Sequence, residues 1–321
     1  MSNPEQSNFF TVNKGEVSKE YTVLTPAEEE LLKRKNQTTE VHQENYKGTS
    51  PGKAVEIMGV DFFGFNAIEK AFGIQLEQCD IPAIPFSEAE LERAKELGQF
   101  LILRVNQTAG GQQLTMENMN QMLADEFKMI GKGKIFFNDD GSGNIDDDAW
   151  YKNEDFFLEE TPKLAWALVT KEIIPDSTRK NYLEQTEIIA TYIKDSVFKD
   201  IIMPPEFADA IDEFDKAKDE IAKFITKGNW QKAAELLEGL AITKLTRQAP
   251  VEVLYDILVY FQNTGNRLRE KTYTWTRRRS SGGGFVIVGG AVGGGVGVDA
   301  YGSGDRGGSL GVFLVPQSLN L

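Results

Sequence analysis

The chain has 321 residues, a formal net charge of −14, one cysteine (Cys79) and one histidine (His42). So negative a chain repels phosphates and anionic lipid, which disfavours binding to nucleic acid or to a membrane surface. The residue counts exclude an internal disulfide and a metal site built from several histidines. Neither a signal peptide nor an apolar run long enough to span a membrane is visible, so a cytoplasmic protein is predicted, with surface display by another route left open.

Residues 1–57 are rich in polar and poor in aromatic residues, which is the composition of a disordered arm. Within this arm, Thr25, Pro26 and Glu28 have the spacing of a capping box and predict the start of one short helix. We expect the folded domain to span residues 58–321.

Helices and strands are both expected in the first half of the domain. Apolar residues within 62–72 have helical spacing, and Ser87 and Thr115 have the features of N-caps of two further helices. Continuous apolar runs predict buried strands at residues 100–105, in the segment ending at Phe137, and at residues 163–174.

Helices dominate the second half until the last strand-like segments. Three are expected in succession, near residues 181–194, near residues 206–226 and after the N-cap Asn229. Another begins at Pro250 and stops at the Asn263-Thr264-Gly265 signal. Alternation around Tyr273 and Trp275 then predicts a strand, so the whole pattern indicates an α+β fold.

The acidic loop 138–148 has some features of a calcium loop. Asp140, Ser142, Gly143 and Ile145 occupy positions that suit an EF-hand, but Ala149 stands where the bidentate glutamate belongs. A calcium site with Asp140 and Ser142 as ligands is one interpretation, and a solvated acidic turn is the other. No other cofactor is indicated.

A glycine pattern near the C-terminus imitates a dinucleotide-binding fingerprint. Gly289, Ala291 and Gly294 follow an apolar strand, as the fingerprint requires. No helix-forming sequence follows them, however, so no helix N-terminus would face a pyrophosphate. We therefore expect no nucleotide site, and because no credible nucleophile–base pair is present either, we expect no enzyme.

The last segment differs in composition from the rest of the chain. Residues 276–315 contain no Lys, Glu, Gln, Met or Trp, although these types are common before them. The residue types that remain can all be encoded by codons ending in a pyrimidine, and the five missing types cannot. A segment whose codons all end in a pyrimidine would have this composition, and a low-complexity glycine-rich segment could have it too.

The stretch 250–315, "PVEVLYDILVYFQNTGNRLREKTYTWTRRRSSGGGFVIVGGAVGGGVGVDAYGSGDRGGSLGVFLV", resembles the C-terminus of variable proteins of bacterial and archaeal diversity-generating retroelements. In those proteins the variable region opens after an aromatic-bearing strand, as at Tyr273 and Trp275. It closes on a Leu-Gly-Val or Gly-Phe-Arg type strand, matched here by residues 310–312. The resemblance implies a C-type lectin-like fold whose variable region is diversified by a reverse transcriptase.

The resemblance places the variable region at residues 276–315. Strands near Trp275, at residues 285–288 and at residues 310–315 are expected to pair antiparallel in one small sheet. Its fixed core positions would be Phe285, Val286, Val288, Leu310, Val312 and Leu314. Its solvent-facing, ligand-binding positions would be Arg278, Ser280, Gly283, Ile287, Gly289, Ala291, Val292, Gly293, Val296, Gly297, Asp299, Ala300, Tyr301, Ser303, Asp305, Gly307 and Gly308.

Two functions from different classes follow. The leading hypothesis is a display protein that binds an unknown protein or small ligand through the variable region. The alternative is a structural or assembly protein whose Gly/Val-rich tail adds strands to a neighbour or self-associates. The oligomeric state is not indicated by the sequence.

Overall fold

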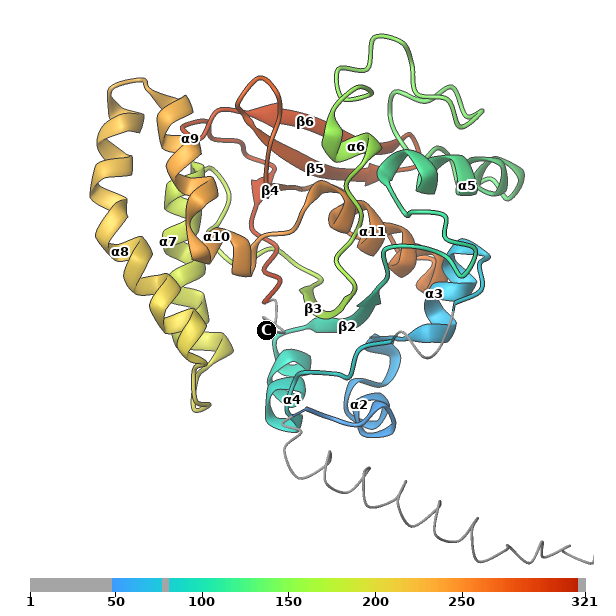
Figure 1. Ribbon diagram of the computed structural model, residues 1–321, viewed down its shortest axis with the longest axis horizontal. Coiled ribbons are helices and arrows are strands. Elements are labelled where there is room, and N and C mark those ends of the chain that lie inside the picture. Colours follow the sequence, from blue (N-terminus) through green and yellow to red (C-terminus); the bar gives the residue numbers. More distant parts are fainter. Residues whose placement is uncertain (1–47, 77–80, 317–321) are drawn as a thin grey trace, which may run out of the picture. The chain divides into compact units, whose positions relative to one another are not determined.

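Helices and two small β-sheets form the described part of the protein, which covers residues 48–76 and 81–316 of a computed structural model (Figure 1). The expected α+β class is therefore confirmed. The helix predicted at Thr25 and the residues His42 and Cys79 lie outside the described residues. Among the described residues, no helix is long and apolar enough to cross a membrane.

The folded body begins earlier than residue 58. Helix α2 (Pro51–Met58) starts at the N-cap Ser50, whose side chain accepts a hydrogen bond from the backbone of Lys53. Ala54 and Met58 on this helix are fully buried or nearly so. The expected boundary at residue 57 is wrong because a cap, a proline at the first turn and two core residues already define a helix there.

The first sheet has the strand order β1-β2-β3, with β1 (Phe62–Phe63) parallel and β3 (Ala165–Thr170) antiparallel to the central β2 (Gln99–Arg104). All six residues of β2 are buried: the apolar run 100–103 as its sequence predicts, and also the polar end residues Gln99 and Arg104. The expected strand ending at Phe137 is wrong. Phe136 forms only an isolated bridge, to Val296.

The 3₁₀ turn η1 (Gly59–Asp61), α3 (Phe65–Phe72) and α4 (Glu88–Glu96) contact this sheet, whereas α5 (Met116–Met129) and α6 (Asp155–Leu158) contact each other and the later helix at residues 250–264. Both predicted caps are confirmed. Ser87 forms a reciprocal capping box with Glu90, and Thr115 accepts a hydrogen bond from the backbone of Asn118. Residues 62–72, expected to be one helix, divide into β1 and α3 at Gly64.

Four helices lie together on one side of the second sheet (Figure 1): α7 (Tyr182–Tyr192), α8 (Pro205–Thr226), α9 (Trp230–Gly239) and α10 (Ala241–Thr246). A π-helical segment, η3 (Ile193–Val197), extends α7. The predicted cap Asn229 starts α9, and α7 begins at the N-cap Asn181, close to the expected start of this helix. Sequence patterns located these helices well, except for α10, which they did not indicate.

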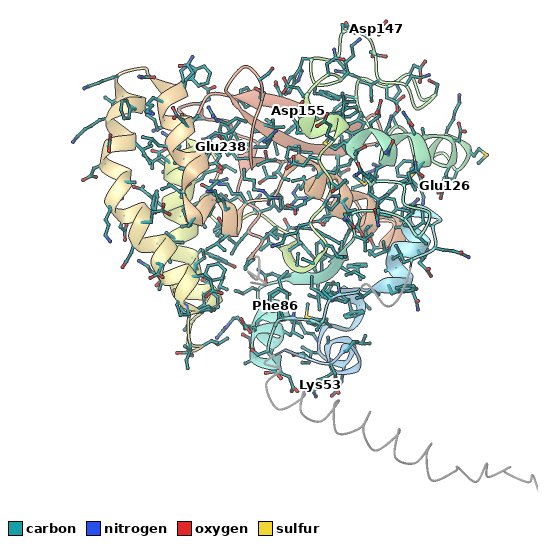
Figure 2. All side chains as sticks on the ribbon, viewed as in Figure 1. Lys53, Phe86, Glu126, Asp147, Asp155 and Glu238 are labelled. Carbon is teal, nitrogen blue, oxygen red and sulfur yellow. The ribbon has the colours of Figure 1, made fainter. Side chains whose placement is uncertain are left out.

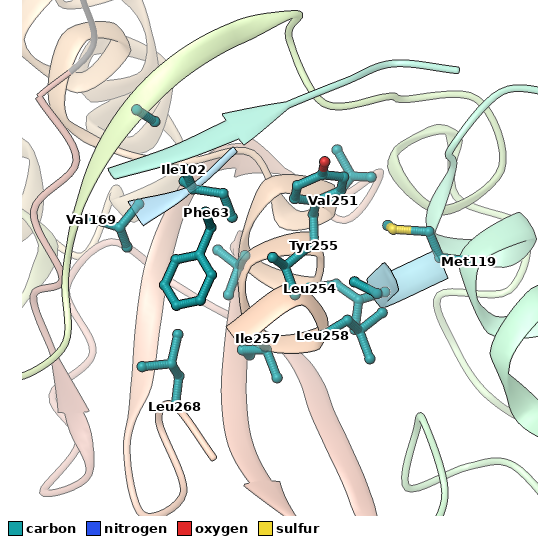
Figure 3. Close-up of a cluster of buried hydrophobic side chains, with 14 of the residues drawn as sticks. Phe63, Ile102, Met119, Val169, Val251, Leu254, Tyr255, Ile257, Leu258 and Leu268 are labelled. Carbon is teal, nitrogen blue, oxygen red and sulfur yellow. The ribbon is translucent and has the colours of Figure 1, made fainter. Parts of the chain in front are cut away.

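Helix α11 (Pro250–Thr264) lies at the centre of the main core (Figure 3). Val251, Leu254 and Leu258 are almost completely buried, and the Tyr255 hydroxyl donates a hydrogen bond to the Leu103 carbonyl at 3.1 Å. The helix ends at Gly265, which has a left-handed conformation as the sequence predicts.

The second sheet has the order β6-β5-β4-β7 and is built from β4 (Tyr273–Arg279), β5 (Phe285–Val292), β6 (Gly295–Tyr301) and β7 (Leu310–Gly311). The strands β4, β5 and β6 form an antiparallel meander. The expectation of a wholly antiparallel sheet is wrong, because β7 pairs parallel with β4. The sheet nevertheless forms, and residues 282–315 contain no helix.

Both faces of this sheet are covered. Val286 and Val288 belong to the core around α11, whereas Phe285 and Ile287 belong to a second core formed with the helices α7 to α10. The Phe285 ring stacks on Tyr182, with ring centroids 3.8 Å apart. The sheet is therefore a middle layer between α11 and the helical group.

Buried charges connect the two sheets through α11. Arg104 on β2 forms a bidentate pair with Asp256, at 3.1 and 2.7 Å, and Arg277 on β4 lies 3.0 Å from Glu252. Burial opposes ionisation of Glu252, but Arg104 and Arg277 outweigh it and hold the pKa of this carboxyl below its usual value. Both charges on α11 are thus compensated from neighbouring strands.

Candidate functional site

A cavity of about 440 Å³ is lined in part by residues of the second sheet. Part of its wall comes from the segment that sequence analysis singled out as variable. The remaining wall comes from β4 and from the loop between α5 and α6. Its lining residues are Phe137, Asn138, Trp150, Tyr151, Tyr273, Ile287, Gly297, Val298, Asp299, Tyr301, Gly307, Ser309 and Leu310.

Strand register explains why one face of the meander reaches this cavity. Asp299 lies opposite Ile287, and Gly297 lies opposite Gly289, which pairs in turn with Tyr273. Because side chains alternate along a strand, these positions share one face, and Val288 and Val298 share the other. The alternation on β6 therefore presents Gly297, Asp299 and Tyr301 to the same side.

The second wall is formed by aromatic residues far away in sequence. The indole nitrogen of Trp150 donates a hydrogen bond to the Val298 carbonyl at 3.2 Å, which fixes this ring against the edge of β6. Tyr151 next to it is buried, and Phe137 is 43% exposed. Sequence analysis did not select these residues as site residues, although aromatic pairs at 136–137 and 150–151 flank the acidic loop on both sides.

Glycine at position 297 makes room for the Tyr273 ring. A Cβ atom there would lie 2.4 Å from the Tyr273 hydroxyl oxygen and 2.8 Å from a ring carbon. The Tyr273 ring therefore occupies the volume that a side chain at position 297 would need. The identity of residue 297 controls the shape of the cavity floor.

Electrostatics in the cavity depend on Asp299. Its carboxylate accepts a hydrogen bond from the backbone of Ala300 at 2.8 Å. Burial, followed by the charge of Asp299, raises the pKa of Tyr273 and of Tyr301. Both hydroxyls therefore stay protonated at neutral pH, and the rings remain neutral.

Eleven of the predicted ligand-binding positions are exposed or partly exposed, but they do not form one site. Asp299, Tyr301 and Gly307 line the cavity. The remaining positions lie at the end of β4 or in the β4–β5 turn, at the end of β5 or in the β5–β6 turn, on the far face of β6, or in the loop before β7: Arg278, Ser280, Gly283, Val292, Gly293, Ala300, Asp305 and Gly308. The first two turns are at opposite ends of β5.

Six predicted positions are buried, so their expected solvent exposure is wrong: Ile287, Gly289, Ala291, Val296, Gly297 and Ser303. Ile287 packs in the helical core, whereas Ala291 and Val296 pack around α11. The Ser303 hydroxyl donates to the Trp230 carbonyl at 2.8 Å. Other elements cover both faces of the sheet. Alternate side chains of β5 therefore point into two different cores, and neither set points into solvent. Ile287 and Gly297 still contribute to the cavity wall.

The acidic loop is held by its own backbone. The Asp140 carboxylate accepts from the backbone of Ser142 at 2.7 Å, and the Asp139 carboxylate accepts from Gly141 at 2.8 Å. Asp139 is buried, with one carboxylate oxygen unpartnered, whereas Asp147 lies at the outer end of the loop (Figure 2). Within the described residues, no three His, Cys, Asp or Glu side chains are grouped to hold a metal. Calcium binding stays a prediction.

Both edges of the second sheet are occupied by other parts of the chain. On β6, Val296 bonds to the backbone of Ile135 and Phe137, at 2.7 and 3.3 Å, and Trp150 covers Val298. After β7, Val312 and Leu314 accept hydrogen bonds from the backbone of residues 174 and 170. Little of either edge is left for a strand from another molecule.

Comparison of the chain with protein-family models, with curated proteins and with solved structures gave no significant match. A functional assignment therefore rests on the residues of this chain.

Proposed function

We propose that this chain is a ligand-binding display protein of the type diversified by retroelement reverse transcriptases, with a C-type lectin-like C-terminal domain. The observation that carries the proposal is the composite cavity. Part of its lining belongs to the compositionally separate segment 276–315, and another part belongs to aromatic residues outside it. Such a cavity would change its ligand when the segment changes, while the rest of the wall stays fixed.

The arrangement of the segment supports the same function. Val286, Val288 and Leu314 are fully buried, so they anchor the meander between two layers. Asp299 and Tyr301 are exposed on β6, and Gly293 is exposed in the turn before it. A binding surface can vary only where side chains do not contribute to the core, and the segment contains positions of both kinds.

The alternative of strand-mediated assembly has less support. Strand addition requires an edge with unpaired N–H and C=O groups. Residues 135–137 and Trp150 already cover much of β6, and residues 312–315 continue beyond β7 with bonds to other segments.

Two matched libraries test the proposal. The first randomises the exposed positions Val292, Gly293, Asp299, Ala300, Tyr301, Asp305 and Gly308. The second randomises the buried positions Phe285, Val288, Leu310 and Val312. For most members of the first library, we expect each substitution to change the free energy of unfolding by no more than about 0.5 kcal/mol. In the second library, each substitution should lower the free energy of unfolding by about 2 kcal/mol or more.

Binding is the second readout. Members of the first library should differ in the ligands that they retain from a panel of small molecules and proteins. General unfolding in this library, or identical binding by all folded members, would contradict the proposal. An independent test is the coding DNA: a nearby near-copy of the region for residues 276–315, differing at adenines and adjacent to a reverse transcriptase gene, is expected.

A further inference from the structure

Exposed aromatic rings converge on the cavity. Phe137, Trp150 and Tyr301 are 43%, 39% and 40% exposed, and all three line it. Large apolar side chains that stay in solvent and face one hollow indicate a binding site more strongly than scattered ones do. Tyr273 adds a fourth ring from the floor.

The charge in the cavity has one sign. Apart from tyrosines, Asp299 is the only ionisable residue among the described residues that line the cavity. No lysine or arginine is among them. Asp299 raises the pKa of both Tyr273 and Tyr301, so its field reaches rings on two strands. The formal net charge of −14 adds a long-range attraction for cations.

Neutral aromatic rings beside a carboxylate favour a particular kind of ligand. The face of an aromatic ring carries negative quadrupole density and attracts a cation, most effectively when the cation is weakly hydrated. A small metal ion would lose a strongly held water shell against these rings, and the described lining offers only one carboxylate in return. An alkylated ammonium group loses less hydration and also fills apolar volume.

We propose that the cavity of this chain binds an organic cation with an alkylated ammonium head group, held between the Trp150 and Tyr301 rings and Asp299. This inference rests on the proposed function, because it names the ligand class for the display site of this particular sequence. The head group could belong to a free small molecule or to a methylated lysine side chain, and the two sources are distinguishable by experiment.

Calorimetric titration of the full-length chain tests the inference with choline and with its neutral isostere 3,3-dimethylbutan-1-ol. The two probes have nearly the same shape and differ in charge. We expect choline to bind about tenfold more tightly or better, and its affinity to fall as salt is added. N-acetyl-trimethyllysine amide is the third probe: tighter binding than choline identifies a protein side chain as the source, and weaker binding identifies a free small molecule.

Three variants locate the effect. Asp299→Asn keeps the acceptor for the Ala300 amide but removes the charge, and it should weaken choline binding about tenfold. Tyr301→Leu should weaken binding severalfold, whereas Tyr301→Phe should preserve it. The control is Asp209→Asn, which removes an exposed charge on α8 that is not part of the cavity lining and should leave binding unchanged.

The outcomes separate this inference from the proposed function. If choline and the neutral isostere bind equally well, or if Asp299→Asn binds choline as well as the parent does, the inference of a cationic ligand is wrong. The proposed ligand-binding display function is not affected by either result. Absence of binding by all three probes also overturns the cation. The display function itself is decided by the two libraries, whose results do not depend on any of these probes.

Discussion

Three glycines of one meander should respond differently to the same substitution. A Cβ atom at Gly289 would lie 2.2 Å from the carbonyl oxygen of Thr272 and 2.6 Å from the Cα of Tyr273. These are backbone atoms of the neighbouring strand, so β4 and β5 would have to separate. At Gly297 the nearest atom, at 2.4 Å, belongs to the Tyr273 side chain, which can rotate, and Gly293 has no neighbour within 4 Å.

These distances set the expected magnitudes. Gly289→Ala should destabilise the protein by about 3 kcal/mol, at the upper end of the cost of overpacking. Gly297→Ala should cost about 1 kcal/mol and move the Tyr273 ring into the cavity. Gly293→Ala should change stability by no more than about 0.5 kcal/mol.

Urea unfolding followed by circular dichroism measures all three variants against the parent. For a body of this size, about 3 kcal/mol corresponds to a loss of roughly 6–12 °C in Tm. Near-UV circular dichroism should change for Gly297→Ala, because the environment of a tyrosine changes. A Gly289→Ala variant as stable as the parent would refute the observed pairing of β4 with β5, and a destabilised Gly293→Ala variant would refute the openness of the β5–β6 turn.

Three further predictions concern charges and caps. Glu252→Gln should cost about 3 kcal/mol at pH 7, because it leaves Arg277 without its carboxylate partner and leaves the buried Arg104 with Asp256 alone. The lowered pKa of Glu252 gives the sign of the pH dependence: its contribution is complete above the unfolded pKa of about 4.3 and is lost as the pH falls through the lower folded pKa, so parent and variant unfolding curves should converge in acid. A constant difference from pH 7 to 3 would contradict this. Ser87→Ala should lower the free energy of unfolding by about 1 kcal/mol, because α4 loses its N-cap. Chemical unfolding measures this change, and an unchanged midpoint would show that the capping box does not contribute to stability. Titration of millimolar calcium should give heat in the parent and less in Asp140→Asn if the acidic loop binds the ion, and no heat would leave a solvated turn.

Local sequence determined much of the helical part of the protein. Ser87, Thr115 and Asn229 each begin a helix where their cap chemistry predicts, because a cap acts on backbone groups two or three residues away. The end of α11 at Gly265 is determined in the same way. The buried strand β2 was also predictable, since the apolar run at residues 100–103 has no polar face to present to water.

Only the tertiary structure decided which residues form the candidate site. The parallel pairing of β7 depends on a connection whose route no local pattern specifies. Ile287 and Val288 are both buried, so their apolar character could not reveal that one faces the helical core and the other faces α11. Trp150 reaches the cavity through a hydrogen bond to Val298, 148 residues further along the chain. Periodicity describes alternation within a segment, but the neighbour that each face meets is a long-range property of the folded chain.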